Sequence, residues 1–160
     1  MNRIGFGTDI HRLVPGKPLI IGGVNVESEL GSDGHSDGDV LMHAATDAVL
    51  GALALGDIGG HFPNSDERWR DAESSQFLEH AVSLVREKGY EIENLDSVID
   101  LEQPKLRSHI DAIRANLAAA IGVDIGRISV KAKTGERVDS VGEGRAIRAQ
   151  AIVLVSQRNV

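Results

Sequence analysis

The sequence predicts a single α/β (α+β) domain spanning residues 1–160, with a mainly four-stranded sheet covered by helices on one face and an N-terminal hairpin. Segments rich in β-branched residues are interspersed with segments whose apolar residues recur at helical spacing. No repeat, low-complexity tract or linker interrupts the chain. The core must be largely aliphatic, because the 160 residues include only three Phe, one Tyr and one Trp.

Four stretches are expected to form the strands of the sheet, namely residues 4–13, 90–101, 128–133 and 146–155. A hairpin is expected over residues 19–26, because the Gly-Gly pair between two β-branched runs permits the positive φ angles of a tight turn. The stretch 27–38 is polar and glycine-rich, and we expect it to be a loop.

Helical periodicity marks three further segments, each with a start or stop signal. Ser36 followed by Asp39 resembles a capping box, and Gly89 and Gly122 are typical helix stops. The expected helices are a segment that follows this capping box and ends at about Leu55, residues 75–88, and a segment that follows Ser108 and ends before Gly122.

Composition limits the classes of partner. The formal net charge of −7 argues against nucleic acid and anionic membranes, which attract basic patches that this chain lacks. A polyanionic small substrate would need metal ions or local cations to neutralise it. Without cysteine, a metal must be bound by His, Asp, Glu or backbone oxygens. No apolar stretch resembles a signal peptide or a membrane span, and we expect a soluble cytoplasmic enzyme.

One group of residues has the composition of a metal site. Asp9 and His11 are two residues apart on an expected strand and therefore project from the same face. His43 lies on the first helix between Asp39 and Asp47, each four residues away on the same helical face. Either His43 is a buried histidine satisfied by one of these carboxylates, or it joins Asp9 and His11 on zinc with an open fourth position. In the second case Asp39 or Asp47 could orient the imidazole.

Further motifs occur between residues 3 and 155: RIGFGTDIH (3–11), IIGGV (20–24), HSDGDV (35–40), HAATDA (43–48), LGDIG (55–59), EQPKL (102–106) and VKAKTGE (130–136). In content, order and spacing they resemble the 2-C-methyl-D-erythritol 2,4-cyclodiphosphate synthase family of the non-mevalonate isoprenoid pathway. A chance match of so many motifs is very improbable.

The resemblance implies zinc bound by Asp9, His11 and His43, and a second divalent ion, magnesium or manganese, bound by Glu136. It implies that 4-diphosphocytidyl-2-C-methyl-D-erythritol 2-phosphate is the substrate, whose 2-phosphate attacks the β-phosphorus and releases CMP. The product would be a cyclic diphosphate, a precursor of terpenoids, and the enzyme a phosphorus–oxygen lyase. The resemblance also implies a homotrimer with active sites shared between subunits.

The resemblance also assigns individual roles. His35 and Thr134 would stabilise the transition state, although without the family they read as a loop histidine and a strand-end threonine. The implied substrate-binding residues are Ser36, Asp57, Ile58, Gly59, Phe62, Asn64, Asp66, Leu101, Pro104, Lys105, Leu106, Ala132, Lys133 and Thr134.

The chain departs from the common family pattern at three places. Asn64 stands where many members have Asp, and Gly135 interrupts the usual threonine run. Glu143 and Arg145 look like the glutamate and arginine of the family pattern with their positions exchanged. The family places this region towards the trimer axis, so the pair is a candidate anion site there. The alternative for this pair is a salt bridge that only positions the final strand.

Two other classes of function compete with the synthase. A metal-dependent phosphohydrolase would use the open zinc position to activate water and would release linear phosphates. A non-catalytic protein would use zinc only to connect a loop to a helix, with a closed metal site and no turnover. Neither class gives a role to the nucleotide-pocket motifs or to Glu136.

Overall fold

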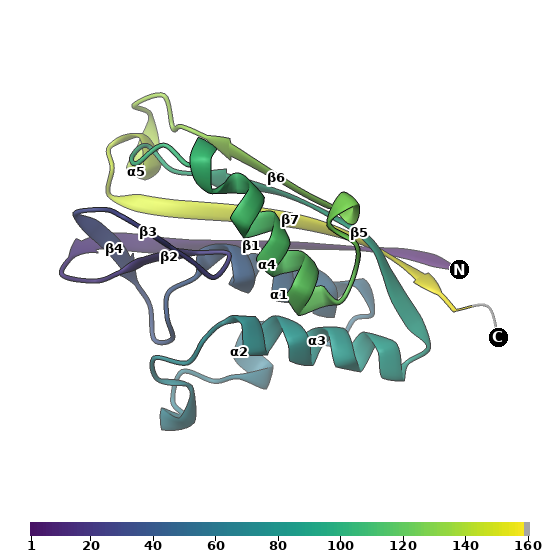
Figure 1. Ribbon diagram of the computed structural model, residues 1–160. Coiled ribbons are helices and arrows are strands. Elements are labelled where there is room, and N and C mark those ends of the chain that lie inside the picture. Colours follow the sequence, from purple (N-terminus) through teal and green to yellow (C-terminus); the bar gives the residue numbers. More distant parts are fainter. Residues whose placement is uncertain (159–160) are drawn as a thin grey trace.

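A computed structural model describes residues 1–158 and shows a five-stranded mixed sheet in the order β4-β1-β7-β5-β6 (Figure 1). Its long central strands, β1 (Asn2–Pro15) and β7 (Ala146–Gln157), pair antiparallel. β5 (Tyr90–Asp100) pairs antiparallel with β7 and parallel with β6 (Ile128–Lys133). The four predicted strands are therefore confirmed, with ends that differ by at most two residues.

The sheet has one strand more than predicted, so the expectation of four strands was wrong. β4 (Leu30–Asp33) pairs antiparallel with the end of β1, from Arg12 opposite Asp33 to Pro15 opposite Leu30. It falls inside the stretch 27–38 that was expected to be a loop. Its sequence, Leu-Gly-Ser-Asp, has little strand propensity, and pairing with a segment distant in sequence determines its conformation.

The predicted hairpin is confirmed as a separate two-stranded sheet of β2 (Leu19–Ile21) and β3 (Val24–Val26). Gly22 and Gly23 form its turn with φ angles of 54° and 72°. Leu19 lies opposite Val26, as a two-residue turn requires.

Three helices cover one face of the sheet: α1 (Val40–Ala52), α3 (Ser75–Glu87) and α4 (Ile110–Ile121) (Figure 1). All three were predicted. The shorter helical segments are α2 (Ile58–His61), η1 (Glu67–Trp69), η2 (Arg107–His109), η3 (Ile125–Arg127) and α5 (Asp139–Gly142). No helix within residues 1–158 combines the length and apolar character needed to cross a membrane.

The start of α1 differs from the expected capping box, because Ser36 does not cap the helix. Asp39 is the cap, and its Oδ1 accepts hydrogen bonds from the backbone N–H groups of Leu41 and Met42. The same fully buried carboxylate accepts hydrogen bonds from both turn glycines of the hairpin, at 2.9 and 2.7 Å. Asp39 therefore joins the start of α1 to the hairpin, and burial raises the pKa of its carboxyl despite these donors.

Helix α1 lies unusually close to β1, because β1 has glycine at two positions beneath the helix. A Cβ atom at Gly5 would lie 1.8 Å from the carbonyl oxygen of Ala48, and one at Gly7 would lie 2.0 Å from that of Ala44. Such distances are far below van der Waals contact. The absence of side chains at these two positions therefore sets the distance between the two elements.

Replacing Gly7 by alanine is expected to push α1 away from β1. Overpacking of this kind costs about 1–3 kcal/mol, which lowers the melting temperature by roughly 2–12 °C in a domain of this size. Calorimetry measures the stability. The matched control is Gly51→Ala in α1 itself, where the added Cβ would meet only the carbonyl oxygen of Phe6, at 3.8 Å. Equal stability of the two variants would contradict the close-packing argument.

Candidate metal centre

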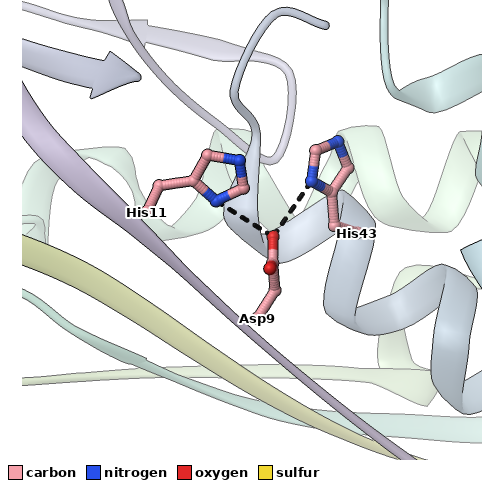
Figure 2. Close-up of side chains that lie close together, drawn as sticks. All are labelled: Asp9, His11 and His43. Atoms are coloured by element: carbon pink, nitrogen blue, oxygen red, sulfur yellow. Dashed lines mark hydrogen bonds and ion pairs between the residues drawn. The ribbon is translucent and has the colours of Figure 1, made fainter. Parts of the chain in front are cut away.

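The predicted metal ligands converge where α1 crosses β1 (Figure 2). Asp9 and His11 project from the same face of β1, as their spacing predicted, and His43 reaches them from the first turn of α1. The two elements meet because of the close packing at Gly7, which lies two residues before Asp9 in the strand and opposite Ala44 in the helix.

The ligand atoms are already close enough to share one ion. Oδ2 of Asp9 lies 3.0 Å from Nδ1 of His11 and 3.0 Å from Nδ1 of His43, and all three donor atoms lie within 4.8 Å of one another. Adjacent ligand atoms around tetrahedral zinc are about 3.3 Å apart, given bonds of about 2.0 Å. Nδ1 of His11 is buried and forms no hydrogen bond with any residue that the structure describes. Two imidazole nitrogens and a carboxylate therefore fit a divalent metal.

The electrostatics of the group match this arrangement. Burial favours a higher pKa for Asp9, but its close polar contacts with the imidazoles of His11 and His43 outweigh burial and lower the pKa to about 2. Burial opposes protonation of His43, yet its hydrogen bond to Asp9 outweighs that effect and raises the pKa of the imidazole. Asp9 therefore carries a negative charge that attracts either protons or a metal ion to the two histidines.

The two carboxylates expected to orient His43 have other partners, so that expectation was wrong. Asp39 accepts hydrogen bonds from backbone N–H groups of α1 and the hairpin. Asp47 accepts a hydrogen bond of 2.7 Å from the backbone N–H of Ile58 at the start of α2. The shared helical face suggested both contacts, but backbone N–H groups of the hairpin, of α1 and of α2 occupy the two carboxylates.

Two serine hydroxyls, instead of carboxylates, lie against the imidazole of His43. Nε2 of His43 lies 2.8 Å from Oγ of Ser74 and 3.0 Å from Oγ of Ser36. Oγ of Ser74 is in turn 2.5 Å from Oδ1 of Asp37. Sequence reasoning did not find Ser74, which is 31 residues from His43 and stands before α3 as an ordinary helix-cap residue.

The metal group opens into a cavity of about 390 Å³. Nine of the predicted site residues line it together: Asp9, His11, His35, Ser36, His43, Ile58, Gly59, Phe62 and Asn64. Nε2 of His35 is buried without a hydrogen-bond partner among the described residues.

An aromatic wall that sequence reasoning missed closes one side of this cavity. Phe62, Trp69 and Phe77 pack with ring centroids 4.5–5.7 Å apart. The three rings come from three different segments, and no spacing in the sequence links them. They give the cavity an apolar side, and the ring centroid of Phe77 lies 6.1 Å from that of His43.

The remaining predicted contacts lie elsewhere in the chain. A second pocket is lined by Lys105, Leu106, Ala132 and Lys133, and it shares no lining residue with the metal cavity. Thr134 and Glu136 follow β6, and the threonine hydroxyl donates a 2.6 Å hydrogen bond to the carboxylate.

Besides Thr134 and Glu136, four of the predicted substrate contacts line neither cavity. Asp57 caps α2 and Asp66 caps η1. Leu101 is buried in the core, and Pro104 lines a separate pocket beside Glu143.

The exchanged pair near the C-terminus is formed. Nε of Arg145 donates a 2.7 Å hydrogen bond to Oε2 of Glu143, and both side chains are exposed. Both alternatives, an anion site and a salt bridge that only positions the final strand, need this ion pair. Anion binding at Arg145 therefore stays a prediction.

Comparison with known proteins identifies the family. The sequence profile described as the YgbB family matches residues 2–156. The chain belongs to the YgbB family. A relative from Solibacter usitatus is 54% identical over 97% of this chain and 98% of its own length, and is named 2-C-methyl-D-erythritol 2,4-cyclodiphosphate synthase. A relative from Oryza sativa, 51% identical over 98% of this chain and 70% of its own, bears the same name with the word chloroplastic.

Solved structures agree with this placement in the YgbB family. A 2C-methyl-D-erythritol-2,4-cyclodiphosphate synthase, described as a form bound to CDP, superimposes with a TM-score of 0.89 and 40% sequence identity. The match covers 96% of this chain and 100% of the other. The family that the motifs predicted is therefore confirmed, and so is the α/β class of the fold.

Proposed function

We propose that this protein is a phosphorus–oxygen lyase that converts 4-diphosphocytidyl-2-C-methyl-D-erythritol 2-phosphate to 2-C-methyl-D-erythritol 2,4-cyclodiphosphate and CMP. It would act in the non-mevalonate route to isoprenoids. The observation that carries the proposal is the convergence of Asp9, His11 and His43 in the cavity lined by His35 and Ser36, in a chain 54% identical to a protein named as this synthase.

In the proposed reaction an oxygen of the 2-phosphate forms a bond to the β-phosphorus. The bond from the β-phosphorus to the oxygen bridging it to the α-phosphorus breaks, and CMP leaves with that electron pair. Asp9, His11 and His43 would hold zinc, and Glu136 would hold magnesium or manganese. Such ions neutralise phosphate oxygens and align them for in-line displacement. No side-chain nucleophile is needed.

The residues of the chain supply binding and orientation. His35 and Ser36 line the cavity in which a phosphate would approach the metal ligands. The aromatic wall would exclude water from the apolar side of the methylerythritol unit. These groups act by positioning and by stabilising charge, which suits a phosphoryl transfer.

The second pocket answers the question of how an acidic protein binds a polyanion. Lys105, Arg107 and Lys133 line it, and none of these three forms an ion pair with a carboxylate within residues 1–158. Their charges are therefore available to a diphosphate. We assign this pocket to the cytidine diphosphate portion of the substrate, with Thr134 and Glu136 at its edge.

The product distinguishes the competing functions. Purified protein is incubated with the diphosphocytidyl substrate, zinc and magnesium, and the products are identified by mass spectrometry. The proposal expects cyclic diphosphate and CMP. Linear phosphates as products would show a phosphohydrolase instead of a synthase. Bound zinc without turnover would favour the non-catalytic protein. A cytoplasmic location stays a prediction from composition.

The proposal includes a homotrimer, for which the outer face of the sheet gives a reason. Ile4 and Phe6 on β1 are 70% and 58% exposed, and Ile152 on β7, directly opposite Phe6, is 49% exposed. Contiguous apolar patches of this kind usually mark interfaces. The metal cavity and the basic pocket have no lining residue in common, and they would combine if each active site formed between two subunits.

Replacing Phe6 by aspartate is expected to convert the trimer to monomers, because a charge would replace an apolar side chain in the interface. Light scattering measures the mass. The control is Ile125→Asp, at an apolar residue of η3 that is 41% exposed and lies outside the patch. A monomeric parent protein with full activity would refute the shared site.

Mixing two inactive variants tests the sharing directly. His43→Ala lacks a metal ligand and Lys105→Ala lacks a pocket cation, so sites formed between different subunits should regain activity when the chains are mixed and reassembled. Mixtures that stay as inactive as the separate variants would place both halves of each site in one chain.

A further inference from the structure

Ser74, whose hydroxyl lies beside His43, does not have the role that its position in the sequence predicts. Ser74 immediately precedes α3, where a serine hydroxyl normally caps the helix. It forms no side-chain cap hydrogen bond, although the residue is fully buried. Its hydroxyl instead lies between the imidazole of His43 and the carboxylate of Asp37.

The direction of each hydrogen bond in this chain of groups is determined. An ionised carboxylate only accepts hydrogen bonds, and Asp37 accepts from the backbone N–H groups of Ser74 and Asp39 at 3.0 Å each. The 2.5 Å contact to Oγ of Ser74 therefore uses the single hydroxyl proton of the serine. With that proton donated to Asp37, Oγ of Ser74 can only accept a hydrogen bond from Nε2 of His43.

Nε2 of His43 therefore carries a proton. Nδ1 is the atom 3.0 Å from Oδ2 of Asp9; it donates a proton to that carboxylate when no metal is bound, and a metal ion would take the place of this proton. Oγ of Ser36, 3.0 Å from Nε2 and 3.3 Å from Oγ of Ser74, is compatible with the same direction. Metal-bound histidines commonly have their second nitrogen held by a carboxylate or carbonyl, and the loss of such a partner typically costs 10–100-fold in metal affinity.

We propose that Asp37 and Ser74 are positioning residues that fix the tautomer of His43, so that Nδ1 is the atom presented to the metal. The inference rests on the zinc site of the proposed function. A hydroxyl relays the effect of the carboxylate, since Asp37 reaches the imidazole through Ser74. Neither residue touches the reacting phosphates.

Zinc affinity is the first test, measured by competition with a chelator of known affinity. Ser74→Ala removes the acceptor that Asp37 orients and leaves Nε2 only the hydroxyl of Ser36, so it is expected to weaken zinc binding about 10–100-fold. Ser74→Thr keeps the hydroxyl and should restore most of the affinity. The matched control is Ser75→Ala, one residue further along, whose hydroxyl has no hydrogen bond to the metal group. Parent-like zinc affinity in Ser74→Ala would overturn the proposal.

A second variant separates orientation from loss of fold. Asp37→Asn keeps the shape but allows its amide to donate to Ser74, which removes the preference for a proton on Nε2. One backbone N–H loses its acceptor, so the melting temperature is expected to fall, but the variant should remain folded at the assay temperature and bind zinc about 10-fold more weakly. Affinity equal to that of the parent in this folded variant would show that Asp37 sets no tautomer.

The nitrogen signals of the zinc-loaded protein give a readout that a purely structural role would not move. Nuclear magnetic resonance should show a protonated, slowly exchanging Nε2 on His43 and a metal-bound Nδ1, with faster exchange of the Nε2 proton in Ser74→Ala. Zinc on Nε2 would overturn the inference. None of these measurements needs turnover, so an inactive parent with this signature would refute the synthase alone.

Discussion

Alanine in place of His43 is expected to weaken zinc binding by two or more orders of magnitude and to abolish turnover. Structural zinc sites with four protein ligands contribute about 10–16 kcal/mol, so one ligand represents about 3 kcal/mol or more, which is on the order of 100-fold in affinity. The helix should persist, because alanine is the best helix former and α1 already contains several. Zinc content after dialysis measures the effect.

A histidine outside the metal group provides the control. His80 lies exposed on α3 and packs against Phe62 with its ring edge, so His80→Ala changes the histidine count without removing a ligand. It should retain one zinc per chain. An unchanged zinc content in His43→Ala would show that this assignment is wrong, whatever the activity of the variant.

Features with a local cause could be predicted from the sequence. Asp9 and His11 share a face because strand side chains alternate, and the turn of the hairpin follows from two adjacent glycines. Gly89 follows the end of α3 and has a φ of 77°, the left-handed conformation typical of a glycine that stops a helix. In each case the physical reason acts over a few residues, so the sequence around it contains enough information.

The features that sequence reasoning missed depend on contacts between distant segments. Strand β4 forms because β1 offers an unpaired edge, and its own residues have no strand pattern. Ser74 meets His43 because α3 packs beside α1, so a residue that reads as a helix cap becomes a partner of a metal ligand. The same reason explains Asp39, whose position four residues before His43 suggested contact while the hairpin turn engaged it.

The predicted substrate contacts came from the family resemblance, and the structure places most of them in two pockets. Those near His35 lie in the cavity of the metal ligands, and those near Lys105 lie in the basic pocket. The two pockets share no lining residue. The proposed reaction would therefore combine them between subunits, and the exposed apolar face around Phe6 would provide the surface for that assembly.

Glutamine in place of Glu136 is expected to lower turnover on the order of 100-fold, equivalent to about 2.7 kcal/mol of transition-state stabilisation, while zinc stays bound. A carboxylate is a preferred ligand of magnesium, and a neutral amide is a weaker one. The change keeps the shape of the side chain, and its amide oxygen can still accept the hydrogen bond from Thr134. Steady-state rates across a magnesium titration should show a higher magnesium requirement together with the lower maximal rate.

A control variant and a zinc measurement test whether Glu136 serves only the second metal. Glu87→Gln changes an exposed carboxylate at the end of α3, and it should leave the rate and the magnesium requirement unchanged. Zinc content is measured on the same Glu136→Gln sample, because Glu136 belongs to the loop after β6 and the zinc ligands to β1 and α1. Loss of zinc in Glu136→Gln would contradict two separate metal sites. A normal magnesium requirement would remove Glu136 from the second site and leave the zinc assignment intact.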